Sequence, residues 1–291
     1  MKAIKVFALL LMFVGFYSCS SDDGDGGGQS VDQDQYFTYV EDDTDYPIEY
    51  ISALRTENVF ELVAEGEGRS IYLNFDKWGQ LILASSDNTE TFEGWTSQYY
   101  YSQESFNFEI VAIDESEKII KVTYSGKLYE DQWDPESDYV QVSGTANVAY
   151  IDNNVDPAFA NMGVTAKIGS DQWRAVKYET TDGWDGIPIR VHAVGEDRWK
   201  ITFRLDTPEL SAGTINFTSA STNRVYLSRY NPATRSFTEY QSSGTLVIDE
   251  LVSSGWGSHI IRGSFTFTAT NPDDNSVVQV QNGVFKQFYN H

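Results

Sequence analysis

Cysteine and histidine, which often serve as metal ligands, nucleophiles and bases, are scarce in this chain of 291 residues: it has one cysteine and three histidines. It contains no His-Glu-x-x-His motif, no cysteine pair and no Gly-x-Ser-x-Gly motif, so the signatures of zinc proteases and serine hydrolases are absent. Phosphate-binding glycine loops are missing too. We therefore expect a protein that is not an enzyme. Carboxylate pairs of the glycosidase kind stay open, so a glycan-active hydrolase is a less favoured alternative.

Basic residues are few as well. The chain has 20 lysines and arginines against 43 aspartates and glutamates, a net charge of −23. Nucleic acid would repel such a chain, so it is excluded as a partner. The charge does not predict disorder, because 41% of the residues are hydrophobic and 14% aromatic, enough to build cores. After the N-terminus, no segment approaches the roughly 20 apolar residues that span a bilayer.

The N-terminus reads as a signal peptide. Lys2 and Lys5 precede an apolar stretch over residues 7–16, and the single cysteine, Cys19, follows directly after it. This order is typical of an exported protein, and the lone thiol needs an explanation. The stretch resembles a bacterial lipoprotein signal, which implies cleavage before Cys19 and acyl chains such as palmitate on it. It departs from the usual pattern in having Phe16 where leucine is common. The alternative is an ordinary secretory signal with an incidental cysteine.

The residues after Cys19 read as a tether. "SSDDGDGG" resembles the acidic signal that sends some lipoproteins to the outer face of the outer membrane. A segment so poor in apolar residues cannot offset the entropy of ordering. We predict a signal peptide over residues 1–18, a flexible acidic tether over 19–35, and a protein on the cell surface attached to the membrane through lipid.

The rest of the chain predicts β-strands. The clearest candidates combine β-branched and aromatic residues, and several alternate with the period of two that a half-buried antiparallel strand requires. They are residues 70–75, 105–113, 118–124, 199–205, 224–230 and 263–269. The best helical candidate is 47–58. We expect an all-β chain of antiparallel strands, arranged mostly as hairpins.

An internal repeat divides these strands into two tandem domains. "SGKLYEDQWDPESDYVQV" (125–142) is similar to "RGSFTFTATNPDDNSVVQV" (262–280), and each copy reads as a hairpin with a proline in its loop. We predict two antiparallel β domains of similar design, sandwich or barrel-like, over residues 36–154 and 155–291. Their charges differ: the first has 24 acidic and 6 basic residues, the second 14 and 12.

Three segments of the second domain carry a family resemblance: "MGVTAKIGSDQWRA" (162–175), "ATRSFTEYQSSGTLVIDEL" (233–251) and "HIIRGSFTFTATNPDDNSVVQVQNGVFKQF" (259–288). They resemble an uncharacterised family of β-rich lipoprotein domains, over about residues 162–288. That family has no assigned activity. The resemblance implies a β fold and an envelope location, and nothing about a ligand.

The loop "YEDQWDPESDY" (129–139) is the sharpest acidic cluster. Its carboxylates at Asp131, Asp134, Glu136 and Asp138 are the hard oxygen ligands that Ca²⁺ prefers. The spacing is not that of an EF-hand, and a solvated hairpin tip is the competing interpretation. We expect no cofactor, with Ca²⁺ as the one candidate.

Aromatic residues in turn-like contexts suggest a second kind of site. Flat rings stack on sugars, and neighbouring carboxylates and amides bind their hydroxyl groups. The candidate glycan-binding residues are Trp78, Trp95, Tyr99, Tyr100 and Tyr101. The same rings are also good strand residues that would fill a core. We expect a binding module for a glycan or an envelope protein; the alternative is a structural or accessory subunit of an envelope complex.

Overall fold

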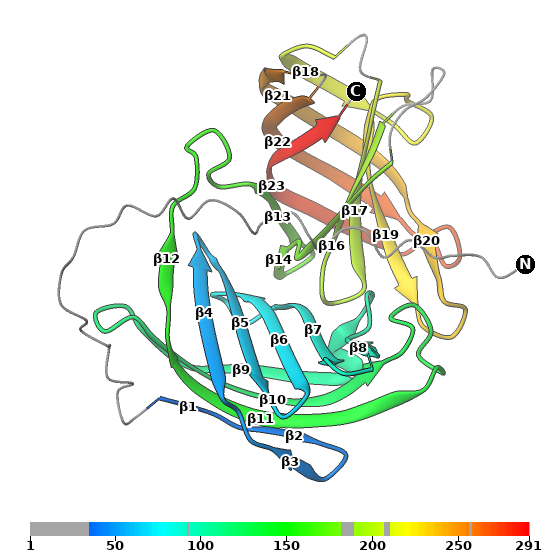
Figure 1. Cartoon of the computed structure of the whole chain (residues 1–291). Helices are drawn as coiled ribbons and strands as arrows, with labels where there is room; N and C mark the ends of the chain where they lie inside the picture. The colour runs from blue at the N-terminus through cyan, green and yellow to red at the C-terminus, as the bar shows by residue number, and fades with distance from the viewer. Residues whose placement is uncertain (1–34, 92, 182–188, 207–209, 256–257, 291) are drawn as a thin grey trace, which may run out of the picture. The chain divides into compact units, whose positions relative to one another are not determined.

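The described part of the chain is built almost entirely of β-strands (Figure 1). The computed structural model describes residues 35–291 except 92, 182–188, 207–209, 256–257 and 291. The predicted signal peptide, most of the tether and Cys19 lie outside these residues. Within the described ranges the single helical element is a one-turn 3-10 helix, η1 (Ser102–Glu104), and no helix there is long and apolar enough to cross a membrane.

The first half of the chain forms one twelve-stranded sheet. Its strands are β1 (Tyr36–Phe37), β2 (Tyr39–Glu41), β3 (Thr44–Tyr46), β4 (Tyr50–Thr56), β5 (Val59–Gly66), β6 (Arg69–Asp76), β7 (Leu81–Asn88), β8 (Gly94–Thr96), β9 (Phe106–Asp114), β10 (Ile119–Tyr129), β11 (Tyr139–Ala149) and β12 (Ile151–Asn153). All pairs are antiparallel except β12 with β4. Strand β10 pairs with β11 on one side and with both β8 and β9 on the other.

Alternation explains these strands. In β5 every second side chain is buried, among them Phe60 and Leu62. Residues 47–58, the best helical candidate, contain a strand instead: residues 50–56 form β4 and pair with β5. The sheet bends so that β4–β7 face β9–β11 across a core (Figure 1). Phe75 of β6 meets Phe108 of β9 there, with 4.4 Å between ring centroids.

A buried polar network lies inside this first core. Glu41 is 4% exposed and forms an ion pair with Arg69 at 2.9 Å. The Tyr39 and Ser86 hydroxyls donate to the same carboxylate. Because the tyrosine is buried and faces an acceptor, its pKa is raised. The network joins β2 to β6 and β7, which are far apart in the sheet order.

The second half of the chain forms two further sheets. The six-stranded sheet contains β13 (Gly163–Ile168), β14 (Asp171–Arg174), β18 (Gly213–Phe217), β21 (Gln241–Gly255), β22 (Ser258–Thr270) and β23 (Val277–Asn290). The five-stranded sheet contains β15 (Lys177–Thr181), β16 (Ile189–Val194), β17 (Trp199–Leu205), β19 (Arg224–Asn231) and β20 (Ser236–Glu239).

These two sheets share one core, as in a sandwich. Phe203 of the five-stranded sheet packs on Phe265 and Phe285 of the six-stranded sheet, with ring centroids 5.4 and 4.8 Å apart. The prediction of an all-β, antiparallel chain is confirmed. The second half of the chain, which we call the second body, forms a sandwich, and the twelve-stranded sheet is the first body. No sheet of the described residues closes into a barrel.

Both copies of the sequence repeat are hairpins: β10 and β11 enclose Pro135, and β22 and β23 enclose Pro272. The last strand of the first sheet ends at Asn153, and the first strand of the second body begins at Gly163. The bodies around the two hairpins differ, since one hairpin lies in a single bent sheet and the other in a sandwich. All these strands lie within one compact unit, Asp34–His291.

Candidate ligand-binding groove

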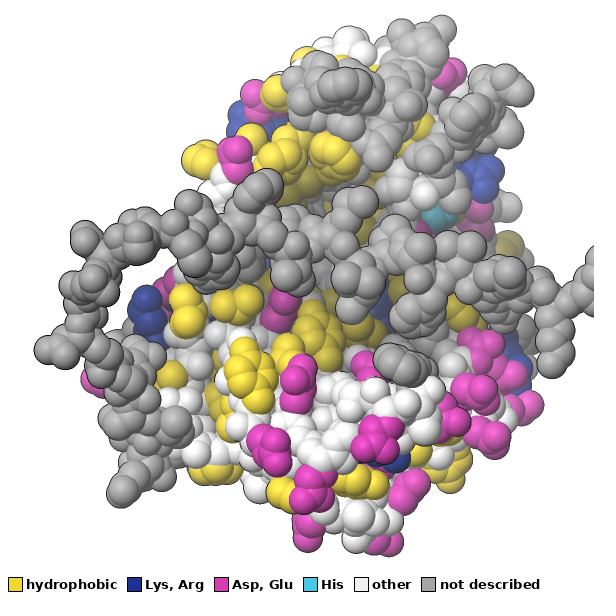
Figure 2. Space-filling view, viewed as in Figure 1, with side chains coloured by type: hydrophobic (Ala, Val, Ile, Leu, Met, Phe, Trp, Pro, Cys, Tyr) yellow, Lys and Arg dark blue, Asp and Glu magenta, His cyan; other side chains and the backbone are white. Residues whose placement is uncertain are grey.

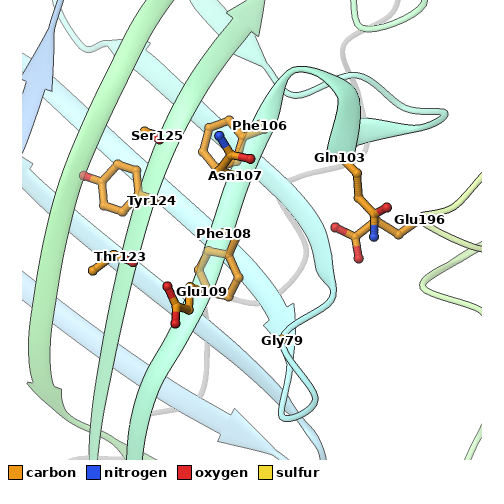
Figure 3. A pocket seen from close by; sticks show the side chains of 10 residues that line it. All are labelled: Gly79, Gln103, Phe106, Asn107, Phe108, Glu109, Thr123, Tyr124, Ser125 and Glu196. Carbon is orange, nitrogen blue, oxygen red and sulfur yellow. The ribbon is translucent and has the colours of Figure 1, made fainter.

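A pocket of about 680 Å³ lies along β9 and β10 (Figure 3). Its lining consists of Gly79, Gln103, Phe106, Asn107, Phe108, Glu109, Thr123, Tyr124, Ser125 and Glu196. A neighbouring pocket of about 570 Å³ shares Asn107 and Ser125 and adds Gln98, Lys127 and Gln141. We call the two pockets together the β9–β10 groove.

The register of the strands makes this groove polar. Asn107 stands opposite Ser125, and Glu109 opposite Thr123. Cross-strand partners point to the same side of a sheet, so these four side chains form one outer face. The alternate residues Phe106 and Tyr124 are 2% and 3% exposed, and their rings belong to the core. The groove therefore offers amides, hydroxyls and carboxylates to a ligand.

Gly126 allows β9 to approach β10 closely at the start of the groove. It pairs directly with Phe106. A Cβ atom at this position would lie 2.4 Å from the Ser105 carbonyl oxygen and 2.5 Å from the Phe106 Cα atom. No L side chain fits there without moving the backbone, so the close approach of β9 to β10 requires glycine at this position.

Glu196 is the groove's buried acid. It lies in the turn between β16 and β17 and is 7% exposed. Burial raises the pKa of this carboxyl to about 7, against a lowering hydrogen bond from Gln103, which points toward it in Figure 3. Lys177, also buried, donates to the Tyr99 carbonyl at 2.8 Å, and burial lowers its pKa to about 8. The groove thus holds a carboxyl group that titrates near neutral pH.

The predicted glycan-binding aromatics are distributed over several places. Tyr99 and Tyr100 form a cluster with Trp133, with ring centroids 4.1 and 5.4 Å from the tryptophan. Tyr100 also packs on Tyr230 and Phe237 and donates to Glu179 at 2.8 Å. Tyr99 and Tyr100 therefore make contacts that hold the chain together, while Trp133 stays 48% exposed.

Among the described residues, the other three predicted rings make no ring contact with this cluster. The Arg198 guanidinium lies over Tyr101, 3.9 Å from the ring centroid. Trp95 of β8 is half-buried and packs on the first core. Trp78, in the β6–β7 turn, is 49% exposed and lies under Arg174, 3.4 Å from its ring centroid. The structure thus brings Tyr99 and Tyr100 together with Trp133, which the prediction did not include.

An arginine forms ion pairs with the acidic loop 129–139. Arg235 contacts Asp134 at 2.8 Å and Glu136 at 2.7 Å. The Asp131 carboxylate accepts from the Trp133 amide, and the Asp138 carbonyl accepts from Glu130. Among the described residues no group of three or more acidic, histidine or cysteine side chains is arranged to hold a metal ion. Two of the four predicted Ca²⁺ ligands therefore have a cation already.

Sequence reasoning missed Asn107, Ser125, Gln103 and Glu196. The sequence did indicate the position of Asn107, because a strand whose Phe106 and Phe108 point into the core must point Asn107 outward. No local pattern marks Glu196, because its neighbours in the groove come from residues 79–125, far earlier in the chain.

Comparison with known proteins identifies one region. Residues 160–288 match a family described as a domain of unknown function (DUF6252). The match begins just before β13 and ends within β23, so it covers the sandwich. It agrees with the expectation of an uncharacterised β-rich domain over about residues 162–288. No curated protein and no solved structure matches the chain.

Proposed function

We propose that this chain, in which residues 160–288 form a domain of unknown function, is a lipid-anchored lipoprotein on the outer surface of the outer membrane that binds a glycan in the β9–β10 groove. The single observation that supports a glycan as the ligand is the polar lining of the groove. The anchor and the location rest on the N-terminal sequence around Cys19.

Volume and lining favour a sugar over an apolar molecule. The larger pocket, about 680 Å³, falls within the range of roughly 300–1,000 Å³ that holds small ligands. Most such pockets are lined by apolar side chains. Here the outer face presents Asn107, Thr123 and Ser125, whose donors and acceptors match the hydroxyl groups of a carbohydrate.

Charge narrows the glycan class. The predicted first domain has 24 acidic and 6 basic residues, and acidic side chains are spread over the face of the first sheet that Figure 2 presents. Glu109 and Glu196 line the groove itself. An anionic sugar would meet like charge there, so the groove is suited to neutral glycans.

Trp133 supplies a stacking surface next to the groove. It belongs to the same loop as Pro135 and Glu136, which line the second of the two pockets. One side of its ring packs on Tyr99, and the exposed remainder is free to stack on a sugar ring. The ring is held in place before the ligand arrives, which reduces the entropy cost of binding.

An array of neutral and acidic glycans tests the ligand. We expect the purified full chain to be retained by neutral glycans. Ser125→Ala and Asn107→Ala each remove hydrogen bonds to the ligand and should weaken retention about tenfold. Ser143→Ala is the matched control, because Ser143 is the partner of Ser125 on β11 and lines neither pocket. Retention that ignores Ser125 and Asn107, or no retention at all, would contradict the proposal.

The anchor has its own test. In cells that process lipoproteins, the full chain should fractionate with membranes and Cys19→Ala should release it. If the Cys19→Ala protein stays on washed membranes, lipidation does not hold the protein there.

A second candidate function is that of an accessory subunit in an envelope complex. The observation that favours it is the apolar edge of the first sheet, where Ile151 of β12 pairs with Leu54 of β4 and the two are 69% and 38% exposed. Edge strands offer unpaired backbone groups to another protein. Ile151→Lys should then abolish a stable complex in detergent extracts without affecting glycan retention.

A further inference from the structure

A further pocket, of about 370 Å³, gathers positive charge on the six-stranded sheet. Arg174, Arg262 and Lys286 line it, against one lining carboxylate, Asp249. This is unusual for a chain with more than twice as many acidic as basic residues. The β9–β10 groove shares none of these residues, so the inference does not rest on the glycan proposal.

The strand register explains why the three cations meet. Arg262 of β22 and Lys286 of β23 are direct cross-strand partners. Lys286 also stands opposite Gly163 of β13, and two residues further along β13, Thr165 stands opposite Arg174 of β14. Residues two apart on a strand point to the same side, so all three cations belong to the outer face of four neighbouring strands.

Like charges directly opposite each other destabilise a sheet unless something compensates them. Arg262 forms an ion pair with Glu250, in which its Nε atom lies 2.9 Å from the carboxylate. The ammonium group of Lys286 donates to the Ala160 carbonyl at 2.6 Å. Within the described part of the chain, no ion pair joins Lys286 to a carboxylate.

Arg174 completes the pocket with a guanidinium held in place by stacking. It lies over Trp78, and its Nε atom is 3.9 Å from Asp76, too far for a hydrogen bond. The small residue Gly163 and the Thr165 hydroxyl form the lining between the cations. Planar guanidinium groups and a lysine are the groups that bind the oxygens of carboxylates and phosphates in proteins.

We propose that this pocket binds the oxyanion of a small acidic ligand, a carboxylate or phosphate group carried on a body about the size of one sugar. The anion lies between Lys286 and Arg262, where it neutralises the like-charged pair. Arg174 contacts the same ligand from the β14 side. The carboxylate of Asp249, which also lines the pocket, disfavours ligands with more than one negative group.

Titration calorimetry on the full chain tests this, at about 10 mM salt where charges are weakly screened. The probes are glucuronate for a carboxylate, glucose 6-phosphate and inorganic phosphate for a phosphate, and glucose as the neutral reference. We expect at least one anionic probe to bind and its binding to depend on Arg262 and Lys286, whereas any binding of glucose in the β9–β10 groove should not depend on these two residues. The probe that binds more tightly tells which oxyanion the pocket takes.

Lys286→Gln and Arg262→Gln should each weaken anion binding at least tenfold. Lys167→Gln is the matched control: it removes one positive charge from the same face of β13, two residues beyond Thr165, at a position that does not line the pocket. Arg262 is exposed, so its variant keeps the test decisive if Lys286→Gln fails to fold. Absence of anion binding, or equal weakening by Lys167→Gln, would overturn the proposal.

Discussion

The two β bodies of this chain carry sharply different charge on a similar number of residues. Residues 36–154 hold 24 acidic and 6 basic side chains, whereas residues 155–291 hold 14 and 12. The β9–β10 groove lies mainly on the first body, with Glu196 of the second body in its lining, and the cationic pocket lies mainly on the second. The first is lined by amides, hydroxyls and carboxylates, and the second by two arginines and a lysine.

This difference teaches that a shared hairpin does not imply a shared ligand. The repeat preserves a glycine that lies close to the backbone of the preceding chain segment: a Cβ atom at Gly126 would meet the Ser105 carbonyl oxygen, and one at Gly263 the Val247 carbonyl oxygen. The outward residues beside those glycines are free to vary, because they contribute little to either core. We infer that the bodies are specialised, the first for neutral ligands and the second for anionic ones.

The largest expected difference between the two bodies is the free energy of unfolding that is lost when an ion pair is broken. Arg69→Met leaves the buried Glu41 carboxylate without its partner, and we expect it to lower the free energy of unfolding by about 3–5 kcal/mol. In the second body, Arg262→Met breaks an exposed pair with Glu250 and should cost about 1 kcal/mol or less. Urea denaturation measures both. Equal losses would remove this distinction between the bodies.

The pH dependence of stability should reveal Glu196. Its pKa is raised to about 7 in the folded chain, above its ordinary value, so the folded state binds a proton more tightly than the unfolded state. The resulting stabilisation is full at pH 4 and is lost as the pH rises through 7. It amounts to about 3 kcal/mol.

Comparison with Glu196→Gln isolates this contribution. Urea denaturation between pH 4 and 8 should show the difference between wild type and variant changing by about that amount, with wild type relatively more stable at the acidic end. A difference independent of pH would mean that this carboxyl is not held in a buried setting.

The paired glycines predict a smaller effect of equal sign in both bodies. A Cβ atom at Gly126 or Gly263 would lie 2.4 or 1.9 Å from a backbone carbonyl oxygen. Gly126→Ala and Gly263→Ala should each destabilise by about 1–3 kcal/mol, since neither site can expand without moving a strand. Thermal denaturation measures both. If one is neutral, the two hairpins are not structurally equivalent.

Much of the fold could be predicted from local alternation. The segments 199–205 and 224–230 correspond to β17 and β19 almost residue for residue, because both are rich in the β-branched and aromatic residues that favour strands. The segment 47–58 was harder to interpret, because its apolar residues fit both a helical and a strand period. Its pairing with β5 makes residues 50–56 a strand.

The site was less predictable. Tyr99 and Tyr100 have the composition of an exposed platform, but rings from Tyr230 and Phe237, more than 100 residues away, cover Tyr100. The acidic loop likewise acquired Arg235 from a distant strand connection. Partners this remote leave no mark in the neighbouring sequence, so composition alone could not separate contacts within the fold from contacts with a ligand.

Hydrogen exchange of the full chain, with and without a neutral glycan that it retains, tests the central claim most directly. We predict slower exchange at the backbone amides of residues 106–109 and 123–125, which line the groove, and no change over 163–165 and 284–286 in the cationic pocket. Protection confined to the cationic pocket, or no protection in either place, would contradict the assignment of the groove as the glycan site.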